Sequence, residues 1–159
     1  VPQLDTSNVT NMSEMFYKCL SLTTIPQLDT SNVIDMSSLF WGCTNLTTVP
    51  QLDTSNVTDM HGMFEDCISL TTIPQLDTSN VIDMSDMFYN CSSLAGELTL
   101  NLPSVKTLRN TFVNTALSSI KINGLHDFNS SFEEYPLVIE DADGIQKIEK
   151  ASINYNTVL

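Results

Sequence analysis

A unit of 24 residues is repeated four times from the start of the chain, and this repetition constrains the fold more than any other feature. The nine residues Val-Pro-Gln-Leu-Asp-Thr-Ser-Asn-Val at Val1–Val9 return almost unchanged at Ile25–Val33, Val49–Val57 and Ile73–Val81. This period is within the range of leucine-rich solenoids, in which each unit buries its apolar side against its neighbours. The sequence therefore predicts a stack of repeats.

Residues that are 24 apart occupy equivalent positions, and each such set is called a column below. Twelve of the 24 columns are invariant in the first four repeats, and a fifth, degenerate repeat keeps the apolar phase through Leu100, Val105, Leu108 and Phe112. We expect a solenoid over residues 1–120, with strong repeats over 1–96 and the degenerate one over 97–120. Residues 121–159 are interpreted as a C-terminal cap or hairpin segment, with hairpin strands at Leu137–Ile139 and Ile145–Ile148.

Apolar side chains within each repeat recur at spacings of three and four, which is typical of one helical face. In the second repeat these are Val33, Met36, Phe40 and Cys43. The spacing predicts a short helix in the middle of each repeat. Its N-cap would be Asp35, with Asn11, Asp59 and Asp83 in the same column, and Gly42 and Asn90 would suit its end.

The β-branched segment Leu46–Val49 follows, and Pro50, which has no N–H, bounds it. This pattern predicts a short strand. The fold class that we expect is therefore α/β: a leucine-rich-repeat-like solenoid with short parallel strands on one face and short helices on the other. Its core would contain one stacked column formed by Phe16, Phe40, Phe64 and Phe88.

The composition excludes several classes of partner. Only 6 Lys and Arg oppose 19 Asp and Glu, giving a formal charge of −13, which repels nucleic acid and anionic lipid headgroups. The chain has no apolar run of membrane-spanning length and no charged leader with an apolar segment, so we expect no membrane insertion. It begins at Val1, inside a repeat, as an excised piece or a processed product of a longer protein would.

The repeated motif Leu-Asp-Thr-Ser-Asn-Val-x-x-Met-x-x-Met-Phe-x-x-Cys-x-x-Leu-Thr-Thr-Ile resembles the BspA-like leucine-rich repeat, a bacterial surface-protein repeat. The resemblance is strong over residues 1–96 and weaker over 97–120, and the segment 121–159 lacks the motif. It implies a leucine-rich-repeat-like solenoid in a secreted or wall-attached bacterial protein, often described as an adhesin. Related repeats also occur in phage-associated proteins.

Repetition favours binding over catalysis, because a catalytic site needs unlike groups that converge once. No nucleophile, base and oxyanion constellation and no phosphate loop is recognisable, so we expect no enzyme activity. The predicted function is non-catalytic binding of a protein or glycan ligand on a host or neighbouring cell, at an extracellular or cell-surface location. The alternative is a structural spacer. The uncapped N-terminal repeat, with Val1, Leu4 and Val9, is a predicted route to oligomers.

The column after the invariant Phe contains Tyr17, Trp41, Glu65 and Tyr89, which are the candidate binding residues. Amphipathic rings stack on sugars and anchor protein contacts, so this column can form a recognition strip. The alternative is that the rings only cover the groove between neighbouring repeats.

A second column contains the four cysteines, Cys19, Cys43, Cys67 and Cys91. A zinc site would need closely spaced pairs such as C-x-x-C, which are missing, and neighbouring helices would stand too far apart for disulfides. We therefore favour buried, reduced thiols.

Two further columns are polar. Asp5, Asp29, Asp53 and Asp77 suit Asx turns, and the alternative is calcium between stacked carboxylates, although the glycine-rich calcium nonapeptide is missing. We otherwise expect no cofactor and no metal. The column formed by Asn8, Asn32, Asn56 and Asn80 is expected to be an internal hydrogen-bonding ladder.

Overall fold

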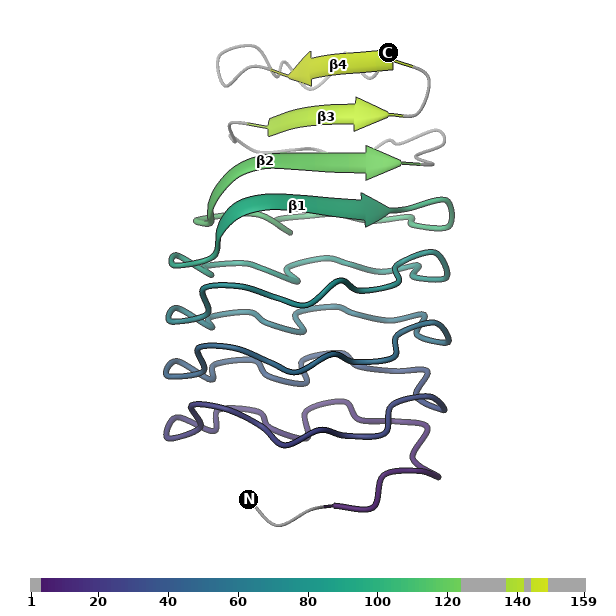
Figure 1. Ribbon diagram of the computed structural model, residues 1–159, viewed down its shortest axis with the longest axis vertical. Coiled ribbons are helices and arrows are strands. Elements are labelled where there is room, and N and C mark those ends of the chain that lie inside the picture. The colour runs from purple at the N-terminus through teal and green to yellow at the C-terminus, as the bar shows by residue number, and fades with distance from the viewer. Residues whose placement is uncertain (1–3, 124–136, 142–143, 149–159) are drawn as a thin grey trace.

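The chain winds as a series of flattened coils stacked on one another, with the first repeat at one end and the C-terminal strands at the other (Figure 1). The computed structural model describes residues 4–123, 137–141 and 144–148. Its strands are β1 (Ala95–Asn101), β2 (Ala116–Asn123), β3 (Leu137–Asp141) and β4 (Gly144–Ile148). Successive repeats therefore do stack, as the 24-residue period predicts.

The helix predicted for the middle of each repeat is wrong, because the described residues of these segments form turns instead. In the second repeat Ser38 and Gly42 have φ angles of 55° and 72°, which a right-handed helix cannot contain. Each closes a four-residue turn; the N–H of Cys43, for example, donates to the C=O of Phe40 at 3.0 Å. The two turns begin at Met36 and Phe40, four residues apart, and the second ends at Cys43, three residues later, so the apolar spacing resembles that of a helix.

Apart from Gly96, the residues with positive φ fall in two columns four positions apart, and Gly42 and Asn90 are therefore turn residues rather than helix stops. Gly, Asn and Asp, which tolerate this conformation best, fill most of these positions. The predicted N-cap residue Asp35 caps a turn, since its carboxylate accepts the N–H of Ser37 at 2.9 Å. The two columns are Glu14, Ser38, Gly62, Asp86 and Asn110, and Lys18, Gly42, Asp66, Asn90 and Asn114.

Backbone groups that a helix would pair internally are paired with the next repeat. The N–H groups of Met36, Ser38 and Phe40 donate to carbonyls one repeat further along, at 3.0, 2.7 and 2.9 Å. Alternate residues bond in this way, and parallel bridges join Asp35 to Asp59 and Asp59 to Asp83. The turns thus form a ladder like that of a parallel sheet, in which every second residue donates its N–H to the next repeat.

The strand predicted at Leu46–Val49 is not a regular strand, although its column supplies one ladder bond per repeat, from the Thr47 N–H to the Thr23 C=O at 3.1 Å. The proline column has no N–H, which prevents a continuous ladder in the first four repeats. In the fifth repeat Leu98 replaces this proline, and there β1 pairs in parallel with β2, with a register shift between Gly96 and Glu97. Among the described residues, the predicted parallel sheet is thus confined to these two strands.

One column of phenylalanine rings runs through the core, as predicted. The rings are stacked with centroids 5.4 to 6.1 Å apart and interplanar angles of 4° to 19°. Inner rings such as Phe64 have no exposed surface, whereas Phe16 in the first repeat is 8% exposed. The stacked residues are Phe16, Phe40, Phe64, Phe88 and Phe112.

Beyond β2 the described part of the tail consists of β3 and β4, which pair antiparallel from Leu137↔Ile148 to Asp141↔Gly144. These strands include the predicted segments Leu137–Ile139 and Ile145–Ile148 and extend beyond them. In Figure 1, β3 lies next to β2. The rest of the predicted cap, including 124–136 and 149–159, lies outside the described residues.

Candidate binding surfaces

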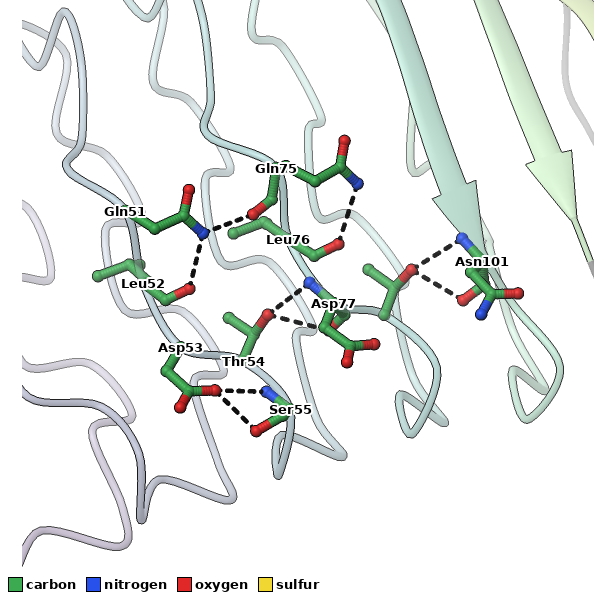
Figure 2. A pocket seen from close by; sticks show the side chains of 10 residues that line it. Gln51, Leu52, Asp53, Thr54, Ser55, Gln75, Leu76, Asp77 and Asn101 are labelled. Carbon is green, nitrogen blue, oxygen red and sulfur yellow. Dashed lines mark hydrogen bonds between the residues drawn. The ribbon is translucent and has the colours of Figure 1, made fainter.

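Two surfaces of the stack carry the repeated polar columns and the candidate binding residues. The first, the Gln–Asp groove, has an apolar floor of Leu52 and Leu76 between the glutamine column and the Asp-Thr-Ser columns (Figure 2). One section encloses about 590 Å³, and an equivalent section between the first two repeats encloses about 580 Å³. The second, the turn surface, comprises the four columns that begin at Ser13, Glu14, Tyr17 and Lys18.

The groove glutamines that the structure describes, and the invariant threonines, are bonded to the next repeat. The amide of Gln51 donates to the carbonyls of Gln75 and Leu52 at 2.7 and 3.1 Å, as Figure 2 shows. The buried Thr54 hydroxyl donates to the Asp77 C=O at 2.9 Å and accepts the Asp77 N–H at 2.8 Å. These side chains complete the ladder beside the proline column, so their repetition has a structural cause.

The aspartates of the groove form the predicted Asx turns. One oxygen of Asp53 accepts the hydroxyl of Ser55 at 2.7 Å and its N–H at 3.1 Å. These two bonds, the hydroxyl first, lower the pKa of the Asp53 carboxyl below its ordinary value of 3.8. No group of three His, Cys, Asp or Glu suited to a metal ion occurs in the part of the chain that the structure describes.

The asparagine column forms the predicted internal ladder. The Asn56 amide donates to the Ser31 C=O at 2.8 Å, and Asn80 makes the same bond to Ser55 at 2.8 Å. Unlike the glutamines, these amides reach back to the preceding repeat. The two ladders thus hold each repeat from both sides.

The cysteines are free, and three of the four are the buried thiols that we predicted. The Cys67 thiol donates to the Phe40 C=O at 3.1 Å. Burial raises the pKa of Cys43 to about 11 and that of Cys91 to about 12. Cys19 is half-buried, so the expectation that all four are buried is wrong for the first repeat, where the core is less covered.

The candidate binding residues of the turn surface form one close aromatic pair and two separate side chains. The Tyr17 and Trp41 rings meet edge to face, with centroids 5.1 Å apart and planes at 83°. The Trp41 indole N–H also donates to the Asp66 carboxylate at 3.4 Å. Glu65 occupies the next position and separates this pair from Tyr89.

Acidic side chains gather on the turn surface around Glu65. Burial first, and then the negative charges of Asp86 and Asp66, raise the pKa of Glu65, while His61 acts in the opposite direction. Asp86 lies 3.4 Å from the Arg109 guanidinium and 4.0 Å from His61. The surface thus has an aromatic part in the first two repeats and an acidic part in the third and fourth.

Sequence reasoning did not single out Lys18, and it assigned Gly42 to the end of a helix, so it missed their contact on the turn surface. The Lys18 ammonium lies 5.0 Å from the centroid of the Tyr17 ring and 5.9 Å from that of Trp41. Its side chain crosses Gly42, where an added Cβ would lie 2.9 Å from the Lys18 Cγ. The signal in the sequence was a lysine in a column that otherwise contains only Gly, Asp and Asn over the first five repeats.

Together these features define a repeat protein whose 24-residue units are joined by backbone and side-chain ladders. The family model described as "Mycoplasma protein of unknown function, DUF285" matches residues 1–67 and 20–125, and the chain belongs to this family. Comparisons with curated proteins and with solved structures gave no significant match. No helix that is long and apolar enough to cross a membrane occurs among the described residues.

Proposed function

We propose that the chain is a non-catalytic binding module of a bacterial cell-surface or secreted protein, and that it recognises a protein or glycan through its turn surface. The resemblance of the repeats to BspA-like leucine-rich repeats supports a location and role of this kind. The observation that carries the proposal is the chemical variation of the turn surface on an otherwise constant framework.

The column of Tyr17 illustrates this variation. The same backbone position holds Trp41 in the second repeat, Glu65 in the third and Val113 in the fifth. A fold that accepts a carboxylate here does not need an aromatic ring, so the Tyr17–Trp41 pair is available for recognition. Exposed aromatic side chains are frequent anchors of binding surfaces.

A structural spacer is the competing function, and the ladders of the Gln–Asp groove favour it. In a spacer, the amides of Gln27 and Gln51 would matter only because they fix the distance between repeats. Turn-surface residues would then be interchangeable. The two functions therefore predict different sensitivities for the two surfaces.

The test is binding of the purified chain to an array of neutral and acidic glycans and to a panel of purified extracellular-matrix proteins. One variant combines Tyr17→Ser, Trp41→Ser and Tyr89→Ser. The matched control changes three groove residues, Gln27→Ala, Gln51→Ala and Gln75→Ala. We expect the first variant to lose binding and the second to retain it at a temperature where both are folded. No binding by the unmodified chain, or loss only in the glutamine variant, would reject recognition by the turn surface.

A further inference from the structure

Lys18 adopts a backbone conformation that is unfavourable for its residue type. Its φ is 51°, in the left-handed region where long side chains are disfavoured. The other repeats place Gly42, Asp66, Asn90 and Asn114 at this position. A residue held in a sparsely populated conformation is a reason to look for function, because the surrounding fold must maintain it.

The fold uses this conformation to hold the Lys18 ammonium beside two aromatic rings. Its distances of 5.0 and 5.9 Å to the Tyr17 and Trp41 centroids lie within the range of cation–π contacts. Gly42 leaves room for the lysine stem, since any side chain there would meet it. Tyr17 and Lys18 are exposed, and Trp41 is half-buried. The result is a positioned cation on an aromatic support that solvent can reach.

No carboxylate lies within 4.0 Å of the Lys18 ammonium among the described residues, although the Tyr17 side chain and then the more distant charge of Asp66 raise the pKa of Lys18. The ion pairs found there join Asp86 to His61 and Arg109, and neither involves Lys18. This is notable in a chain with a formal charge of −13. A positioned charge that makes no close ion pair is available to an anionic group of a ligand.

We propose that the Tyr17–Lys18–Trp41 cluster binds a saccharide that carries a single carboxylate, an inference that rests on the proposed recognition function. The ammonium takes the carboxylate, while the exposed aromatic surface contacts the apolar C–H groups of the sugar. The net charge repels polyanions such as acidic peptides and nucleic acids, and this favours one isolated negative charge on a neutral body.

Trp41 provides a direct reporter, because it is the single tryptophan of the chain. The experiment titrates the folded protein with sialyllactose and with lactose and follows Trp41 fluorescence. We expect saturable binding of sialyllactose and binding of lactose that is weaker by about tenfold, the effect of one charge-assisted hydrogen bond. Equal affinity for the two sugars would overturn the proposal.

Variants test the role of the positioned cation. Lys18→Gln should reduce the affinity for sialyllactose to that for lactose, while Lys106→Gln, the same change at an exposed lysine of the fifth repeat, should leave it unchanged. Gly42→Asn keeps a residue suited to positive φ but places a side chain against Lys18, and should weaken binding as well. A preference for sialyllactose that survives both Lys18→Gln and Gly42→Asn would reject the site.

Two further results separate this proposal from the more general one. A capped Gly-Glu-Gly peptide that binds as tightly as sialyllactose would show a carboxylate site without preference for sugar, which contradicts the saccharide proposal. If array binding depends on the turn surface but sialyllactose does not bind, the recognition function stands and the saccharide inference fails. If neither the array nor sialyllactose shows binding, both the recognition function and the saccharide inference fail.

Discussion

The Gln–Asp groove and the turn surface belong to the same coils but follow opposite rules. In the groove, exposed side chains such as Gln51 and Asp53 are identical in four repeats, and each has polar atoms bonded to neighbouring groups. On the turn surface, the column of Trp41 changes from aromatic to acidic to aliphatic without disturbing the turns. Constancy on an exposed surface thus has a structural explanation here, and variation marks the positions that are free to serve recognition.

The turn surface itself contains both restricted and unrestricted columns. Two of its columns require positive φ and favour Gly, Asn and Asp, whereas the aromatic column has no such restriction. Glu14, Ser38 and Lys18 are the exceptions in these two columns. Lys18 differs from the other two in that its charge lies beside two aromatic rings, which is why the proposed recognition function centres on it.

The largest expected loss of stability comes from a substitution in the core, which both surfaces cover. Phe64→Ala should lower the free energy of unfolding by about 3 to 5 kcal/mol, because its ring is fully buried between Phe40 and Phe88. The adjacent change Glu65→Ala, on the turn surface, should shift it by less than about 0.5 kcal/mol. Thermal and urea unfolding measure both changes.

Deletion of the whole unit 49–72 provides the control for the phenylalanine stack. Since each repeat presents the same faces, its neighbours can close the gap, and we expect the deletion to be milder than Phe64→Ala. A deletion more damaging than the single substitution would contradict interchangeable repeats.

The next effect lies in the groove. Thr54→Val removes the hydroxyl that serves both the N–H and the C=O of Asp77, and should cost about 1 to 3 kcal/mol. Thr58→Val is the matched control, because the column of Thr58 already contains Ile34 and Ile82, and it should change stability by less than about 0.5 kcal/mol. Equal effects in urea unfolding would mean that the Thr54 ladder adds nothing.

A smaller effect tests whether the groove glutamines are ladder donors. Gln51→Ala should cost about 0.5 to 1.5 kcal/mol through its lost bond to the Gln75 C=O. Gln51→Glu keeps the shape but places an acceptor against two carbonyls, so it should be more destabilising than alanine. If Gln51→Glu is less destabilising than Gln51→Ala, the amide of Gln51 does not stabilise the fold as a hydrogen-bond donor.

Much of this structure was predictable from the sequence because repetition makes each column an independent check. The phenylalanine stack, the Asx turns at Asp53 and the Asn56 ladder follow from residue type and period alone. The helix did not, because two turns of four residues produce the same apolar spacing as a helix. The Gly, Asn and Asp residues of the two positive-φ columns indicate turns, but Glu14 and Ser38 in the same columns made this signal hard to recognise.

The strands and the candidate site were harder to predict for different reasons. Pro50 indicates where a strand ends, yet only the ladder itself shows that a missing N–H in each of the first four repeats prevents a regular strand. The aromatic column was visible as Tyr17 and Trp41, but their edge contact and the position of Lys18 between repeats depend on side-chain packing. No spacing rule within one repeat encodes such contacts.

The smallest effect is a pH dependence of opposite sign on the two surfaces. The pKa of Asp53 is lowered by Ser55, so its ionised form stabilises the fold above pH 3.8, and this contribution is lost as pH falls through the lower folded pKa. Burial and neighbouring carboxylates raise the pKa of Glu65 above 4.5, so its ionised form destabilises the fold, and the penalty disappears as pH falls through the raised pKa. At neutral pH, Asp53→Asn should therefore lower the melting temperature, and Glu65→Gln should raise it by the equivalent of less than about 1 kcal/mol, since Glu65 is partly exposed.

Melting curves from neutral pH to about pH 2 should show the Glu65→Gln difference vanishing first, and then the Asp53→Asn difference, because the carboxyl of Glu65 protonates at the higher pH. Shifts of the same sign for the two variants would contradict the electrostatic contrast between the groove and the turn surface.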